Sequence, residues 1–128
     1  MIPKDLRYHQ EHEWVRVSST QATVGISHFA QDALGDIVFI DMPKPGAIVK
    51  AGQQIGEVES TKTTSTIYTP VSGTIAKVNV DLKDHPEVVN SDPYGKGWMV
   101  VIDLSNPSDA DKLMTAAQYE AFLAGQKH

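Results

Sequence analysis

The sequence of 128 residues contains no cysteine. Without thiols the chain can form no disulfide, no zinc–thiolate site and no cysteine nucleophile. Any redox chemistry in which the protein takes part must therefore come from an attached group and not from its own side chains.

Clustered basic residues and long apolar runs are also missing. The net charge is −5, the pI is about 5.4, and the Lys and Arg residues are scattered singly. Binding to a nucleic-acid backbone requires clustered cations, so we expect no nucleic-acid partner. No apolar run approaches the roughly 18 residues that cross a bilayer, so we expect no membrane partner either.

The first ten residues contain neither an apolar stretch nor an amphipathic Arg- and Ser-rich pattern, so we expect no targeting segment. This favours a bacterial cytoplasmic protein, or a protein of the mitochondrial matrix if a transit peptide has been removed. The length suits one domain, and the 41% of hydrophobic residues can form a core. We expect a monomer with a single domain over residues 1–128, whose core covers about 6–124.

Short stretches that alternate apolar and polar residues, separated by Gly and Pro, make up most of the chain. This spacing is typical of half-buried strands joined by turns. It predicts strands at residues 12–17, 22–26, 37–42, 47–50, 54–60, 63–69, 74–80 and 98–104. The polar, proline-interrupted segment 81–90 is predicted to be a loop.

Capping residues predict helices at the edges of this β-rich chain. Ser27 is suited to begin a short helix that Gly35 ends in a left-handed conformation. Thr115 and Gln118 match a capping box for a last helix, which Gly125 ends, with a frayed tail beyond it. The pattern as a whole predicts a mainly β fold, a flattened barrel or sandwich with short peripheral helices.

One lysine lies between two predicted strands, at the tip of a hairpin. Lys62 is flanked by the small hydroxyl residues Thr61 and Thr63. A tight tip projects a side chain from a fixed place on a rigid sheet and gives a modifying enzyme access to it. This arrangement suits a lysine that carries a long mobile arm. The alternative is that Lys62, one of nine lysines, is a solvated turn residue whose charge keeps the sheet edge soluble.

The hairpin resembles the lipoylation segment of the glycine cleavage H proteins at Glu59-Ser60-Thr61-Lys62 and at Tyr68-Thr69-Pro70-Val71-Ser72-Gly73. The similarity continues in family order over nearly the whole chain, from about Leu6 to about Phe122. Further matching motifs are Leu6-Arg7-Tyr8, His12-Glu13-Trp14-Val15, Val24-Gly25-Ile26, Leu34-Gly35-Asp36-Ile37-Val38-Phe39, Asp92-Pro93-Tyr94-Gly95 and Gly97-Trp98.

Two related families fit less well. Biotin carriers have a similar hairpin but usually place a methionine on each side of the lysine, where this chain has Thr61 and Thr63. Lipoyl domains of the 2-oxo acid dehydrogenase acyltransferases are shorter and usually joined to other domains by linkers. The resemblance therefore implies the lipoyl/biotinyl carrier fold in a single lipoyl-carrier domain.

The resemblance implies a non-catalytic carrier with lipoic acid attached covalently to Lys62 by a lipoylating enzyme. It implies three further partners. The pyridoxal-phosphate glycine decarboxylase supplies the aminomethyl group of glycine, the tetrahydrofolate-dependent aminomethyltransferase takes it over, and dihydrolipoamide dehydrogenase receives the electrons. Two alternatives stay open: an H-like protein that relays lipoyl groups to other lipoyl-dependent enzymes, and an unmodified interaction module.

Two glutamates match positions of interest in the family. Glu13 matches a glutamate of the cleft that holds the aminomethyl-loaded arm, and its alternative role is that of a surface strand residue. Glu59 is expected to help the lipoylating enzyme to recognise the hairpin; its alternative role is that of an exposed strand residue paired across the sheet.

The chain also departs from the family. Thr66 stands where many relatives have an acidic residue, and Phe29 where some have a histidine. The full polar clamp on the arm's amine is therefore not carried over. We expect no metal site, because His9 and His12 have no third ligand clustered with them.

Overall fold

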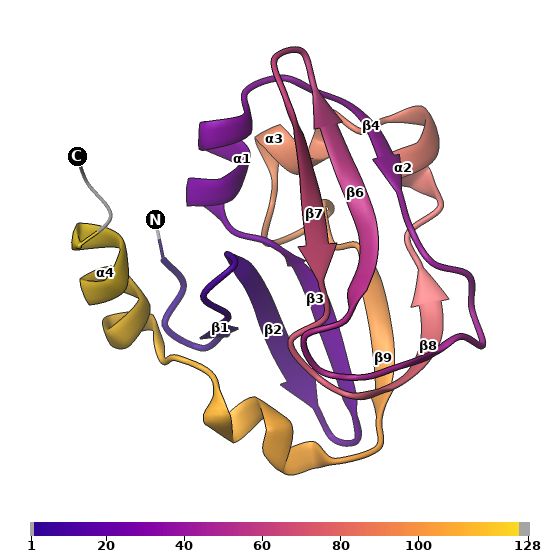
Figure 1. Cartoon of the computed structure of the whole chain (residues 1–128), viewed down its shortest axis with the longest axis vertical. Helices are drawn as coiled ribbons and strands as arrows, with labels where there is room; N and C mark the ends of the chain where they lie inside the picture. Colours follow the sequence, from indigo (N-terminus) through magenta and orange to yellow (C-terminus); the bar gives the residue numbers. More distant parts are fainter. Residues whose placement is uncertain (1, 126–128) are drawn as a thin grey trace.

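A computed structural model of the chain, which describes residues 2–125, has two antiparallel sheets with helices at their edges (Figure 1). The larger sheet has six strands in the order β1-β2-β3-β9-β8-β5, and the smaller has three in the order β4-β6-β7. The strands are β1 (Arg7–Tyr8), β2 (Glu13–Ser18), β3 (Gln21–Ile26), β4 (Ile37–Asp41), β5 (Ile48–Val49), β6 (Gln54–Ser60), β7 (Thr64–Tyr68), β8 (Gly73–Val78) and β9 (Val100–Leu104). The helices are α1 (His28–Leu34), α2 (Asp81–Asp84), α3 (Val88–Ser91), the 3-10 helix η1 (Pro107–Lys112) and α4 (Ala116–Ala124).

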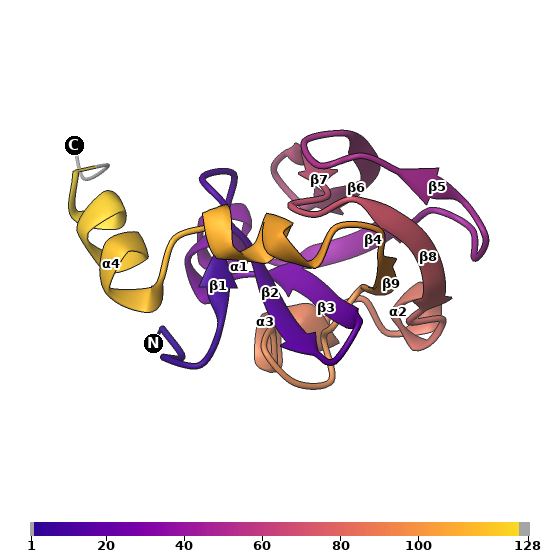
Figure 2. The same cartoon turned by 90° about the horizontal axis from the view of Figure 1, so that it is seen from below.

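The main hydrophobic core lies between the two sheets. The β6–β7 hairpin lies on one side of it, and β2 and β3 lie on the other (Figure 2). Alternation fixes which face of each strand is buried: Val58 of β6 points inward, whereas its neighbours Glu57 and Glu59 are exposed. The predicted mainly β sandwich is therefore confirmed, although the sheets do not close into a barrel.

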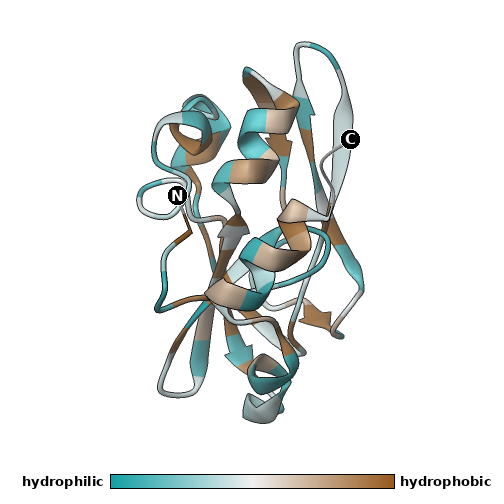
Figure 3. Cartoon of the chain, turned by 90° about the vertical axis from the view of Figure 1, so that its left-hand side faces the viewer, coloured by the Kyte–Doolittle hydropathy of each residue, from teal (hydrophilic) through white to brown (hydrophobic). Residues whose placement is uncertain are grey.

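A second buried cluster joins α4 to the N-terminal strands. The rings of Tyr8 and Tyr119 are stacked with centroids 4.5 Å apart, beside the buried Trp14. The predicted capping box is present, because Thr115 Oγ1 accepts from the Gln118 N–H and Gln118 Oε1 accepts from the Thr115 N–H. Figure 3, in which α4 faces the viewer, shows both hydrophobic and hydrophilic residues along this helix. The cap fixes where α4 begins, and the aromatic stack holds the helix against β1.

The prediction of a loop over residues 81–90 is wrong, because this segment contains α2 and the first part of α3. Each helix has four residues and buries one apolar side chain, Leu82 in α2 and Val89 in α3. A helix of a single turn is too short to show a periodic pattern and is stabilised by packing against the rest of the fold.

The other differences are small. His12 does not begin the first long strand as predicted: β2 starts at Glu13, and His12 has a φ of 76°. Most other strand ends are displaced by one or two residues. Gly35 ends the Ser27-capped α1 with a positive φ of 80°, but its ψ of −152° differs from the predicted left-handed helical conformation. The predicted frayed tail lies outside the described residues. None of the helices in the described part of the chain has the length and apolar character to cross a membrane.

Candidate functional site

Lys62 lies at the tip of the β6–β7 hairpin, as the sequence predicts. Glu59 of β6 pairs with Thr64 of β7, so residues 60–63 form the turn. The Ser60 N–H donates to the Thr63 carbonyl at 2.8 Å. The Ser60 hydroxyl also accepts from the backbone N–H groups of Lys62 (3.3 Å) and Thr63 (3.1 Å). The buried Ser60 side chain therefore fixes the backbone from which Lys62 projects.

The tip is also tied to the segment that joins α1 to β4. The Thr61 N–H donates to the Asp36 carbonyl at 3.0 Å. Asn90 of α3 holds the same segment, because its amide donates to the Gly35 carbonyl (2.8 Å) and accepts from the Ile37 N–H (2.9 Å). Three separate parts of the chain thus anchor the base of the Lys62 side chain.

Gly35 lies beneath Lys62. A Cβ atom at this position would lie 3.0 Å from Lys62 Cε, and the φ of +80° is one that side-chain-bearing residues rarely adopt. The glycine therefore allows the lysine stem to pass close over the backbone at the end of α1.

The Lys62 side chain is exposed, and within residues 2–125 its amine has no hydrogen bond and no ion pair. Its neighbours Thr61 and Thr63 are small and exposed. An acyl group can therefore be attached to the amine without displacing a partner in the described part of the chain. These residues fit the lipoyl group that the resemblance implies.

Glu13 is buried, with 1% of its surface exposed, so the alternative of a surface strand residue is wrong. One carboxylate oxygen, Oε2, accepts from the Tyr68 N–H at 3.0 Å, and Oε1 lies 3.1 Å from His9 Nδ1. Burial raises the pKa of Glu13 above its ordinary value of 4.5, and the contacts with His9 and Tyr68 oppose this rise. Glu13 thus joins β2 of the large sheet to β7 of the small one.

Strand β7 separates Glu13 from the hairpin tip. It runs from Thr64, beside the turn, to Tyr68, whose N–H contacts Glu13. At about 3.3 Å per residue, these two ends lie roughly 13 Å apart. The structure therefore places Lys62 and Glu13 at opposite ends of one strand and not in direct contact.

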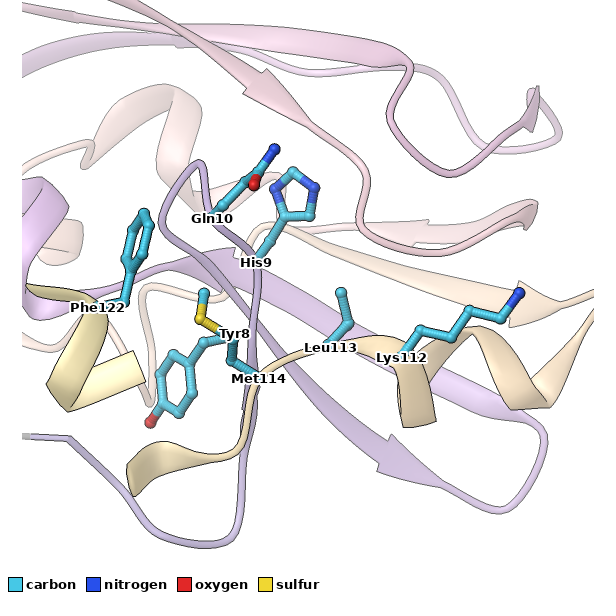
Figure 4. Close-up of a pocket in the computed structure, with 7 residues that line it drawn as sticks. All are labelled: Tyr8, His9, Gln10, Lys112, Leu113, Met114 and Phe122. Atoms are coloured by element: carbon cyan, nitrogen blue, oxygen red, sulfur yellow. The ribbon is translucent and has the colours of Figure 1, made fainter. Parts of the chain in front are cut away.

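A cavity of about 310 Å³ opens beside His9 (Figure 4). Figure 4 shows the ring of His9 and the amine of Lys112 among side chains that are partly apolar. The lining residues are Tyr8, His9, Gln10, Lys112, Leu113, Met114 and Phe122. His9 therefore contacts the buried Glu13 carboxylate and also lines this cavity.

Glu59 is exposed on the outer face of β6. Its cross-strand neighbours are Phe39 and Thr64, neither of which is charged. The structure gives Glu59 no ion pair within the described residues. The exposed position and the uncharged cross-strand neighbours agree both with a residue that a lipoylating enzyme contacts and with the alternative, an exposed strand residue paired across the sheet.

The two residues that depart from the family lie apart from the tip turn. Thr66 is half-buried in β7 opposite Glu57. Phe29 of α1 is exposed and lies against the ring of His12, with centroids 4.8 Å apart. Neither position holds a charged group, so the structure provides no polar clamp at Thr66 or Phe29.

Two residues of this site were not predicted from the sequence. Ser60 stood out only as part of the matched motif Glu59-Ser60-Thr61-Lys62, although its hydroxyl organises the turn. His9 was considered only as a metal ligand, although it is a partner of Glu13. Ser60 could have been found, because a serine at the first position of a turn commonly bonds to the backbone two or three residues later.

Comparisons with known proteins agree with this geometry. The sequence model of the family described as "Glycine cleavage H-protein" matches residues 6–126. A glycine cleavage system H protein of Bacillus subtilis (strain 168) is 56% identical over 119 residues, which are 93% of this chain and 94% of that protein. A glycine cleavage system H protein of Myxococcus xanthus (strain DK1622) is 50% identical over 122 residues, or 95% of each chain.

A solved structure is similar over almost the full length. The crystal structure of a glycine cleavage system H protein from Mycobacterium marinum superposes with a TM-score of 0.86 at 40% sequence identity, and the match covers 98% of each chain. Since the family model covers nearly all of the sequence and the fold agrees, the chain belongs to the glycine cleavage H-protein family.

Proposed function

We propose that this chain is the lipoyl carrier of a glycine cleavage system and that Lys62 carries lipoic acid through an amide bond. The observation that carries the proposal is the exposed Lys62 amine, without a partner in the described residues, on a turn held by Ser60 and Asp36. Family membership supports it, because the similar bacterial proteins are named as glycine cleavage system H proteins.

In this role the carrier takes the aminomethyl group of glycine from glycine decarboxylase to aminomethyltransferase and then delivers electrons to dihydrolipoamide dehydrogenase. The lipoyl group supplies the sulfur chemistry that a cysteine-free chain lacks. The protein itself supplies a rigid base for the arm and catalyses no step. Contacts with successive partners must be transient, so we propose a monomer with weak, exchangeable interfaces. The bacterial relatives support a bacterial cytoplasmic location.

We propose different roles for Glu13 and Glu59. The buried Glu13 carboxylate is suited to pair with a cationic amine that the arm brings to the Tyr68 end of β7. The amine would take the place of His9 as the partner of Glu13 Oε1. Glu59 lies three residues before the modified lysine on an exposed face, where a lipoylating enzyme can contact it.

Peptide mass spectrometry of protein isolated from its native host, or treated with a purified lipoylating enzyme, tests the attachment site. Lys62→Arg should abolish the lipoyl mass increment, because arginine keeps the charge but offers no acylable amine. Lys50→Arg is the matched control, since Lys50 is also exposed beside a turn between two strands, β5 and β6. Wild-type protein that stays unmodified at Lys62, in cells whose other proteins are lipoylated, would contradict the proposal.

An assay with glycine decarboxylase separates glycine cleavage from the lipoyl-relay alternative. Modified protein should promote release of carbon dioxide from glycine by the purified decarboxylase, and Lys62→Arg protein should not. Protein that is lipoylated but inert with the decarboxylase would favour the relay.

A further inference from the structure

The edge strand β4 exposes two consecutive apolar side chains, Val38 (52% exposed) and Phe39 (51%). A regular strand turns neighbouring side chains to opposite faces, but the pairing of β4 with β6 shifts register between Ile37 and Phe39. The irregularity thus leaves both side chains in solvent. Large exposed apolar groups that cluster on a surface commonly mark an interaction site.

A groove runs beside this edge of the sheet. It has a volume of about 350 Å³ and lies between β4, the end of β8 and α2, next to the 72%-exposed Val80. Figure 1 shows α2 beside β4 on the flank of the hairpin. The groove residues are Phe39, Ile40, Asp41, Met42, Val78, Val80 and Lys83. We call this feature the β4 groove.

Carboxylates without cationic partners line the adjoining face of the sheet. Asp41 lies directly opposite Glu57 in the ladder, and Glu59 is two residues further along β6. In residues 2–125 the ion pairs are His9–Glu13 and His85–Glu87, so none of these three carboxylates is neutralised there, not even by Lys83. Like charges placed opposite one another destabilise a sheet, and a basic partner would relieve the repulsion.

Strand β4, which borders the β4 groove, pairs with strand β6 of the hairpin that bears Lys62. Phe39 pairs with Glu59, and Ile37 pairs with Ser60, the first residue of the turn. An enzyme that encloses the Lys62 amine must cover the tip, and a typical partner surface of about 800 Å² extends well beyond the turn. Enzymes that meet only the distal end of a long arm have no such need to cover the tip.

We propose that the β4 groove and the carboxylates Asp41, Glu57 and Glu59 form the docking surface for the enzyme that acylates Lys62. This inference rests on the proposed function. The partner inserts an apolar side chain beside Phe39 and Val80 and places Lys or Arg side chains against the carboxylates. Such an apolar centre with a charged rim is the usual anatomy of a specific interface.

Acylation kinetics test the proposal with unmodified protein as the varied substrate of a purified lipoate–protein ligase supplied with lipoate and ATP. In the measured step the acyl group moves from the activated carboxyl to Lys62 Nζ, and AMP and the proton of the amine leave. Phe39→Ala and Val80→Ala should each raise KM about tenfold with little change in kcat, because docking contacts act before the chemistry.

Ile48→Ala is the matched control. Ile48 is 79% exposed but lies on β5, which pairs with the start of β8 and not with the end that borders the groove. Its KM should equal that of the wild type. Replacing Asp41 and Glu57 by Asn and Gln should weaken the dependence of KM on salt, because screening acts on the removed charges.

Two outcomes distinguish failure of the proposed function from failure of the docking surface alone. Wild-type protein that the ligase does not modify at Lys62 would overturn the proposed function itself. Wild-type protein modified at Lys62, with Phe39→Ala and Val80→Ala both as efficient as Ile48→Ala, would overturn the docking surface alone. Urea unfolding of each variant establishes that it is folded, and lipoylated Phe39→Ala should still be reduced and reoxidised by dihydrolipoamide dehydrogenase at the wild-type rate.

Discussion

At the scale of single residues, Glu13 is a buried carboxylate whose protonation depends on the groups around it. Glu13 has 1% of its surface exposed, and the groups that compensate its charge are the Tyr68 N–H and the His9 ring. Burial is the largest influence on this group and raises its pKa above 4.5. The folded protein therefore keeps a proton on Glu13 at pH values where the unfolded chain has released it.

Because Glu13 binds its proton more tightly in the folded state, the free energy of unfolding should depend on pH. Between the ordinary pKa of 4.5 and the raised pKa of the folded state, the free energy of unfolding contributed by Glu13 falls as the pH rises, because the folded state binds more protons than the unfolded state. Glu13→Gln removes this titration, so the variant should gain stability relative to the wild type as the pH rises through this window. Urea unfolding at a series of pH values measures the difference.

The control is the same Glu-to-Gln substitution at an exposed position. Glu11 is an exposed glutamate two residues away, and Glu11→Gln makes the same change of charge at the surface, so it measures the effect of losing a surface carboxylate alone. Parallel curves for Glu13→Gln and the wild type would show that Glu13 has the same affinity for its proton in the folded and unfolded states.

At the scale of elements, the β6–β7 hairpin depends on the Ser60 hydroxyl. This group accepts from two backbone N–H groups and donates to the Thr63 carbonyl at 3.1 Å. Ser60→Ala should cost about 1 kcal/mol of stability and speed amide hydrogen exchange at Lys62 and Thr63, because the turn loses these bonds. Ser65→Ala, at an exposed position of β7 whose hydroxyl has no hydrogen bond within the described residues, is the control. Equal exchange at the tip in both variants would argue against a role of Ser60.

Sequence patterns predicted the helices and strands that are determined by residues close together in the chain. The strands with alternating residues, the Ser27 cap and the Thr115–Gln118 box follow from neighbouring residues alone. Helices α2 and α3 could not be predicted in this way, because Leu82 and Val89 are buried by residues far away in the sequence. The site divides in the same way: the position of Lys62 follows from its hairpin, whereas the contacts of Glu13 with His9 and Tyr68 depend on how the two sheets pack.

At the scale of the whole molecule, the structure separates what stabilises the fold from what performs the proposed function. One buried cluster fills the space between the sheets, and another joins α4 to β1 and β2 around Tyr8, Trp14 and Tyr119. Burial raises the pKa of Tyr119 to about 12, and its hydroxyl bonds to Ser27 at 2.7 Å. Lys62 belongs to neither cluster.

Folding should therefore be independent of modification. The Lys62 amine has no partner within residues 2–125, so acylation removes one positive charge without breaking a contact described there. Solvated surface changes of this kind typically alter the free energy of unfolding by less than about 0.5 kcal/mol. Unmodified and lipoylated protein, the latter without an aminomethyl group, should unfold cooperatively with nearly the same midpoint in urea and on heating. Loss of cooperative unfolding in the unmodified protein would contradict this view, because it would mean that the arm contributes to the packing of the sheets. A carrier whose fold did need its arm could not present a finished hairpin to the enzyme that attaches it.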